Sequence, residues 1–177
     1  ARIREQWGLN EPLYVQYFEY IKNLLRGDLG QSPVYRVDVW EFVKLRMFNT
    51  FILVAPAMTF TYLFGSVVGT IAGSKRGGLL ERIGIVPVIA TGSFPAFCTS
   101  IVLIVVFADW FNLFPTSGML SATSATGLEW WEPYLSWDFA HHYVLPFTAV
   151  FLRYLFIPSL IMRTSVVEVM GQDHTEY

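Results

Sequence analysis

Charged side chains are unevenly spaced along this chain, and the stretches without them are long. Residues 50–73 carry none, and the run ends sharply at Lys75. A helix of that length crosses a hydrocarbon core of about 30 Å, because each residue advances about 1.5 Å. Two further apolar runs follow at residues 84–108 and 143–163, the second with Arg153 in its middle. The pattern therefore predicts an all-α membrane bundle with three transmembrane helices.

The composition agrees with a chain that lies in lipid. Hydrophobic residues make up 54% of the sequence and charged residues 15%, against roughly 25% charged residues in soluble domains, and the mean hydropathy is +0.44. A net charge of -2 gives no concentrated basic face for nucleic acid. The single Cys98 excludes an intrachain disulfide.

The links between the runs predict an orientation. The link 74–83 holds three basic side chains, whereas the link 109–142 holds acidic side chains and no lysine or arginine. By the positive-inside rule the first link is cytoplasmic and the second is extracytoplasmic, which returns residues 164–177 to the cytoplasm. Residues 1–49 then lie outside, although they are rich in both basic and acidic side chains, because long translocated segments follow the rule poorly. An outer N-terminal segment also implies an earlier span or a cleaved signal upstream.

Residues 1–49 are expected to form two amphipathic helices at the membrane boundary. Asn10 or Glu11 is placed to cap the first helix, Pro12 to occupy its first turn and Gly27 to end it. The second, near residues 37–48, leads into the first span. An ordinary soluble amphipathic helix is the alternative for the first of them.

Small residues and prolines mark two places inside the spans. Gly65, Gly69 and Gly73 recur every four residues on one face of the first span, which favours close helix packing, with chance recurrence as the alternative. Ser93 and Pro95 lie in the middle of the second span, where proline removes a backbone hydrogen bond. Freed carbonyls in lipid need partners, so this break predicts either a kink beside a translocation pathway or a purely structural kink.

Arg153 is the most informative single residue. At the centre of a span, an unaided guanidinium costs roughly 2.5 to 3.5 kcal/mol on insertion scales. No aspartate or glutamate occurs in the three predicted spans, so a carboxylate partner would come from another helix, another subunit or cargo. Pro158 frees the carbonyl of Tyr154 as a local alternative. We expect Arg153 either to line a pathway or to make a structural contact in the bundle.

Motifs for catalysis or cofactor binding are not recognisable. The residues before Lys75 are ordered Gly-Ser-Lys, unlike a phosphate loop. Asp138, His141 and His142 suggest either a metal site or histidines at the membrane interface, and adjacent histidines on a helix favour the second. We therefore expect no catalytic residue, no metal and no cofactor.

Several blocks of residues resemble the dipeptide and oligopeptide ABC transporter permeases, and they recur in the same order over nearly the whole chain. They are Gly8-Leu9-Asn10-Glu11-Pro12-Leu13 with Gln16-Tyr17, Leu25-Arg26-Gly27-Asp28-Leu29-Gly30-Gln31-Ser32, Arg46 with Asn49-Thr50, Leu113-Phe114-Pro115-Thr116-Ser117-Gly118-Met119, Val144-Leu145-Pro146, and Met162-Arg163-Thr164-Ser165 with Glu168-Val169-Met170-Gly171-Gln172-Asp173.

The resemblance implies part of a type I ABC importer in the plasma (inner) membrane, lacking a first span and the last helices. Its implied partners are a second permease subunit, cytoplasmic ATP-binding subunits that hydrolyse ATP, and an extracytoplasmic peptide-binding protein. It also implies that Glu168, Gly171, Gln172 and Asp173 lead into a coupling loop beyond Tyr177. Arg153 departs from the small or apolar residues expected there, and His174 stands in place of an aromatic residue.

Other functions are alternatives to the peptide importer. A secondary transporter or channel is expected to carry acidic residues within its spans. An importer for nickel or another small solute would share this architecture. A structural anchor would not need the broken second span. The outer tryptophans Trp130, Trp131 and Trp137 suit either docking of a binding protein or a position at the lipid headgroups.

Overall fold

The structure divides into two units, Ala1–Phe51 and Ile52–Tyr177. The computed structural model describes residues 11–75, 77–121 and 131–171. Within these ranges the regular structure is helical, and extended pairing is limited to an isolated bridge between Gln31 and Asp38. The all-α fold predicted from the sequence is confirmed.

The first unit contains α2 (Leu13–Leu25) and the start of α3. Pro12 precedes α2 instead of occupying its first turn, because its backbone is extended and its carbonyl already accepts the N–H groups of Val15 and Gln16. No side chain caps this end in the described residues, and Asn10 lies outside them. Gly27 follows the helix with φ of 81°, the left-handed conformation that ends helices and suits glycine.

The long helix α3 (Val39–Ser74) has 36 residues. Its start is capped by Asp38, whose carboxylate accepts the N–H of Trp40 at 3.0 Å. The helix joins the helix expected near residues 37–48 to the run 50–73 without a break. At about 1.5 Å per residue it is longer than a hydrocarbon core of about 30 Å.

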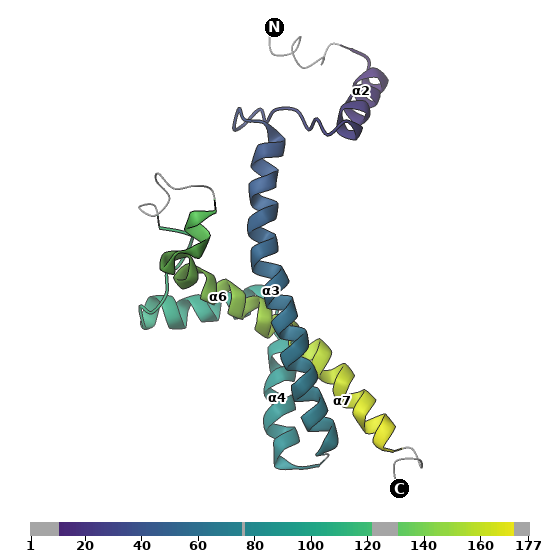
Figure 1. Ribbon diagram of the computed structural model, residues 1–177, viewed down its shortest axis with the longest axis vertical. Coiled ribbons are helices and arrows are strands. Elements are labelled where there is room, and N and C mark those ends of the chain that lie inside the picture. Colours follow the sequence, from purple (N-terminus) through teal and green to yellow (C-terminus); the bar gives the residue numbers. More distant parts are fainter. Residues whose placement is uncertain (1–10, 76, 122–130, 172–177) are drawn as a thin grey trace. The chain divides into compact units, whose positions relative to one another are not determined.

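In the second unit, the buried side of α3 is lined by small residues. They are Ala57, Thr61, Gly65, Gly69, Ala72 and Gly73. This small-residue seam faces α7 (Phe156–Met170), which Figure 1 draws in yellow against the teal half of α3. Because such side chains add little thickness, the two backbones approach each other closely.

Aromatic rings join another face of α3 to α6 (Trp137–Tyr154). Phe60 lies edge-on to Phe147 at 5.8 Å between ring centroids, and Phe64 contacts Phe151 at the same distance. Such aromatic pairs add to the packing energy beyond the area they cover. The four-residue spacing on both helices therefore lets rings of α3 meet rings of α6 turn after turn.

The second apolar run is broken into α4 (Leu79–Ser93) and α5 (Ala96–Leu103), and α5 continues as a π-helix, η1 (Ile104–Trp110). The two limbs bend by 106° at the break. The break predicted at Ser93 and Pro95 is therefore present. α4 contacts α6 and α7, and α5 contacts α6.

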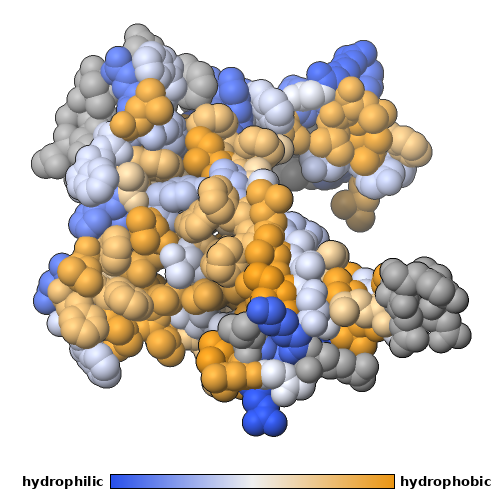
Figure 2. All heavy atoms as spheres, turned by 60° about the horizontal axis from the view of Figure 1, so that its bottom comes forward, coloured by the Kyte–Doolittle hydropathy of each residue, from blue (hydrophilic) through white to orange (hydrophobic). Residues whose placement is uncertain are grey.

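The surface of the helices is apolar. Val39–Ser74 and Trp137–Met170 are long and apolar enough to cross a membrane, and a third crossing results if the bent pair counts as one. Large apolar side chains such as Phe60, Leu63 and Ile101 are more than half exposed, and Figure 2 shows hydrophobic residues covering much of the visible helix surface. Apolar area of this extent suits contact with lipid or further helices.

Candidate functional site

The break in the second run brings α4 against the start of α7. Pro95 lacks an N–H, so the carbonyl of Thr91 has no partner in the usual helical position. Gly92 lies directly under the ring of Phe156, where a Cβ atom would come within 2.5 Å of the ring. Ser93 donates to the carbonyl of Ile89 at 3.0 Å. The break is therefore fixed by a close glycine–aromatic contact, while Ser93 and Pro95 remain exposed.

Arg153 lies in the last turn of α6, close to the same place. Its guanidinium carbon is 5.9 Å from the centre of the Tyr154 ring and 5.7 Å from that of Phe156. These are cation–π distances. Among the described residues the recorded ion pairs do not include Arg153. The ring of Phe156 thus stands between Arg153 and the break at Gly92, and the structure records no direct contact of Arg153 with Ser93 or Pro95.

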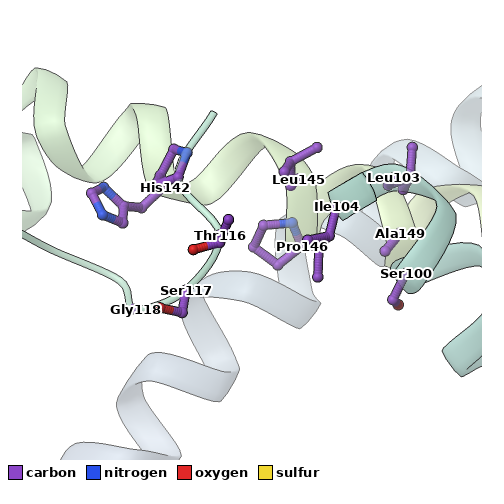
Figure 3. Close-up of a pocket in the computed structure, with 11 residues that line it drawn as sticks. Ser100, Leu103, Ile104, Thr116, Ser117, Gly118, His142, Leu145, Pro146 and Ala149 are labelled. Carbon is purple, nitrogen blue, oxygen red and sulfur yellow. The ribbon is translucent and has the colours of Figure 1, made fainter. Parts of the chain in front are cut away.

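A cavity of about 260 Å³ lies between α5, α6 and the loop that follows η1. Figure 3 shows Thr116 and Ser117 of the loop facing Pro146 and His142 of α6. Apolar walls complete the cavity, together with Ser100. Such a lining suits a small solute that carries both apolar and hydrogen-bonding groups.

His141 and Asp138 hold that loop against α6, and His142 bonds within α6. His141 Nε2 is 2.6 Å from the carbonyl oxygen of Leu113, and His142 Nδ1 is 2.8 Å from the carbonyl oxygen of Asp138. Because a carbonyl only accepts, Nδ1 of His142 is the donor in this bond. Asp138 in turn accepts the backbone N–H and the hydroxyl of Ser121 at 2.7 and 2.6 Å. Asp138 and the two histidines therefore act as structural ties here.

The outer tryptophans predicted to dock a partner or meet lipid headgroups are largely exposed where the structure describes them. Trp137 is 85% and Trp131 47% exposed, and Trp130 lies outside the described residues. Nearby, burial raises the pKa of Tyr134 above its ordinary value of 10.0. The tyrosine therefore stays protonated across the physiological range.

One hydrogen bond between α3 and α6 could be foreseen from the sequence only in part. Tyr143 donates its hydroxyl to the backbone carbonyl of Ile52 at 2.9 Å. Ile52 lies four residues before Pro56, which has no N–H to offer this carbonyl. The proline in the sequence signals the freed carbonyl, but the identity of its donor depends on how the two helices pack.

An ion pair joins α4 to α7 at the other end of the second unit. Arg163 donates through Nε to Glu81 at 2.7 Å and through Nη2 to the same oxygen. The second carboxylate oxygen of Glu81 accepts the N–H of Gly77 at 2.6 Å. From the sequence, Glu81 is recognisable only as part of the link 74–83. Its partner could not be predicted, because charge patterning does not reveal a residue so distant in the chain.

The predicted lead-in to a coupling loop is described in part. α7 ends at Met170, with Glu168 exposed on its last turn and Gly171 after it. Gln172 and Asp173 lie outside the described residues. Gly65, Gly69 and Gly73 all lie against α7, where added Cβ atoms would meet Pro158, Ser159 and Val166 respectively.

The chain is similar to curated bacterial proteins over nearly its whole length. It is 30% identical over 174 residues to the glutathione transport system permease protein GsiC of Salmonella choleraesuis, covering 98% of this chain and 51% of that protein. It is 31% and 28% identical over 172 residues to the proteins of the same name in a strain of Escherichia coli and in Pectobacterium atrosepticum, each covering 97% of this chain and 50% of the relative. No family model matches the chain.

The chain spans about half the length of these relatives. The similarity runs through the helices of both units and through the broken second run, and it agrees with the apolar helices of the structure. Along this length the chain is therefore homologous to the permease components of ABC transport systems, which are proteins of the inner membrane.

Proposed function

We propose that this chain forms part of the translocation pathway of an ATP-driven importer for small peptides. The observation that carries this proposal is its similarity, over 98% of its length, to a permease protein named for glutathione transport. Glutathione is a small peptide with two carboxylates and a thiol. The proposed cargo is therefore glutathione or another short anionic peptide.

In this proposal α3, the bent pair α4–α5 and the pair α6–α7 each cross the membrane. The link 74–83 faces the cytoplasm and the link 109–142 faces outward, in agreement with the distribution of basic side chains. The cavity beside His142 then belongs to the outer half. Residues Glu168 to Tyr177 reach the cytoplasm as the lead-in to a coupling loop.

Arg153 with Ser93 and Pro95 forms the proposed pathway. A guanidinium without a recorded carboxylate among the described residues, set against aromatic rings, suits transient binding of a carboxylate. Intramembrane charge of this kind usually faces the bundle interior or water. The broken helix supplies freed carbonyl groups at the same depth.

The chain is proposed to work within a larger assembly. A second permease subunit completes the pathway, cytoplasmic ATP-binding subunits hydrolyse ATP, and an extracytoplasmic binding protein delivers the peptide. Trp131 and Trp137 are exposed on the proposed outer side, where they are available to that protein or to lipid headgroups. The chain itself performs no chemistry in this scheme.

Uptake of labelled glutathione tests the proposal. A strain lacking its own glutathione importer would receive the complete operon with the full-length gene. We expect ATP-dependent uptake that an Arg153→Gln variant lowers more than it lowers the protein level in the membrane, with Arg153→Lys intermediate. Absence of uptake of glutathione and of short peptides by the unaltered operon would contradict the proposed cargo, and equal losses of uptake and protein level would contradict the role of Arg153.

A further inference from the structure

We propose that Glu81 and Arg163 form a positioning pair that makes α4 follow α7, so that movement of the lead-in segment reaches the break in the second span. The inference rests on the proposed function and deepens it, because it names the contact that links the coupling region to the pathway. Neither residue touches cargo in this scheme. Both act through the helices they join.

Both oxygens of the Glu81 carboxylate accept hydrogen bonds. One oxygen of Glu81 accepts two N–H groups from the Arg163 guanidinium, and the other accepts the backbone N–H of Gly77. The carboxylate, at the start of α4, therefore binds both the link before that helix and α7. Charge-assisted hydrogen bonds of this type are about twice as strong as neutral ones.

The pair is partly shielded from water. The side chain of Glu81 is 14% exposed and that of Arg163 29% exposed. Exposed ion pairs contribute little, because water and salt screen them, whereas shielded pairs interact more strongly and cost more when one partner is removed. Loss of either side chain would remove this ion pair between α4 and α7.

Two contacts at opposite ends tie α4 to α7. At one end Gly92 lies under the ring of Phe156, the first residue of α7. At the other end Glu81 binds Arg163. Since residue numbers fall along α4 as they rise along α7, the two helices run antiparallel between these contacts. A shift of α7 along its axis must therefore either carry α4 with it or break the ion pair.

Arg163 is also placed to sense movement of the lead-in. It lies five positions before Glu168 on the same unbroken helix, and its backbone borders the small-residue seam at Gly69 and Gly73. α4, in turn, runs from Glu81 to the break at Ser93 as one helix, with Pro87 inside it. The contacts from Glu168 to the break thus include the ion pair between Arg163 and Glu81, and charge reversal can remove and restore that pair.

The test uses the complete transporter in proteoliposomes with its ATP-binding subunits and binding protein. Glu81→Arg, Arg163→Glu and the double swap would be compared for the number of ATP molecules hydrolysed per labelled glutathione imported, and for ATP hydrolysis without cargo. We expect each single swap to raise the ratio of ATP to cargo by about tenfold and the double swap to return it to within about twofold of the unaltered transporter.

Arg82→Glu is the matched control, because it makes the same change in charge as Arg163→Glu, one residue from Glu81 at an exposed position. Its ratio should stay near that of the unaltered protein. Unchanged ratios in both single swaps, or a double swap no better than the singles, would overturn the inference. If a swap fails to accumulate in the membrane, Glu81→Gln and Arg163→Gln replace it, and the same two readouts apply.

Failure of the proposed function would look different. The unaltered transporter would then import no glutathione, yet ATP hydrolysis without cargo would still report the pair. A rise in this basal rate in the single swaps, reversed in the double swap, supports the inference whatever the cargo, and a basal rate equal in all variants opposes it.

Discussion

A single hydroxyl group satisfies the backbone at the proline of α3. Pro56 cannot donate to the carbonyl of Ile52, and Tyr143 of α6 does so instead. In lipid no water is available to take over this bond, so an unpaired carbonyl would be costly. Tyr143 is therefore expected to stabilise the bundle through the backbone of another helix, in addition to its ring contacts.

This explanation predicts a coupling between the two residues. Tyr143→Phe should lower the free energy of unfolding in detergent micelles by about 1 to 2 kcal/mol, because the carbonyl loses its donor. In a Pro56→Ala background the helix supplies its own N–H, so the same change should cost much less. Tyr154→Phe, at a 41% exposed tyrosine without a recorded hydrogen bond, serves as the control. Equal losses in both backgrounds would contradict the explanation.

For single residues, the sequence indicated which charged groups and backbone carbonyls need a partner but not which residues provide it. Arg153 stood out because a charge in an apolar run is costly, and Pro56, Pro95 and Pro158 each mark a carbonyl without its usual donor. The contacts of Tyr143 and Glu81 join residues 91 and 82 positions apart in the chain. Such pairs depend on helix packing, which no local pattern specifies.

Helix pairs are held in two different ways. α3 meets α6 through interleaved aromatic rings and meets α7 through the small-residue seam. At the seam a Cβ atom on Gly69 would overlap with the carbonyl oxygen of Ser159 and would come within 2.8 Å of Met162 Cβ. A backbone oxygen cannot rotate away as the end of a flexible side chain can. The contact between α3 and α7 therefore leaves no space for a methyl group.

We predict that Gly69→Ala destabilises the protein and that Gly84→Ala does not. The first forces α3 and α7 apart, at a cost of about 1 to 3 kcal/mol typical of overpacking. The second places a Cβ atom 3.7 Å from Val68, an ordinary contact, and alanine favours the helix. Thermal unfolding in detergent, followed by circular dichroism, measures both. Equal midpoints for the two variants would show that the seam tolerates a methyl group.

The sequence predicted the helical elements better than their limits. Runs free of charge located the apolar helices because charged side chains dominate the cost of insertion, and Gly92 to Pro95 located the break because proline removes a donor. The continuity of α3 through Thr50 and the early start of α4 at Leu79 were not predicted. Both depend on backbone hydrogen bonds that the apolar pattern does not encode.

For the whole molecule, the orientation in the membrane stays a prediction, and it can be measured. In a cysteine-free background of the full-length protein, which includes Cys98→Ser, Ser74→Cys places a thiol in the link 74–83 and Ser117→Cys places one in the link 109–142. A membrane-impermeant maleimide should label position 117 in intact cells and position 74 only after permeabilisation, because basic links remain in the cytoplasm. The opposite labelling would reverse the proposed orientation.

The small-residue seam also bears on how such a protein can diverge. Where two backbones touch, the contact requires a residue without a side chain. Almost every substitution at Gly65, Gly69 or Gly73 is therefore expected to disturb the contact. Residues such as Leu63 and Val67 on the outside of the same helix face surroundings that accept any apolar replacement. We therefore expect one edge of the helix to accept few substitutions and the other edge to accept many, so that relatives that share little sequence can keep the same arrangement of α3 and α7.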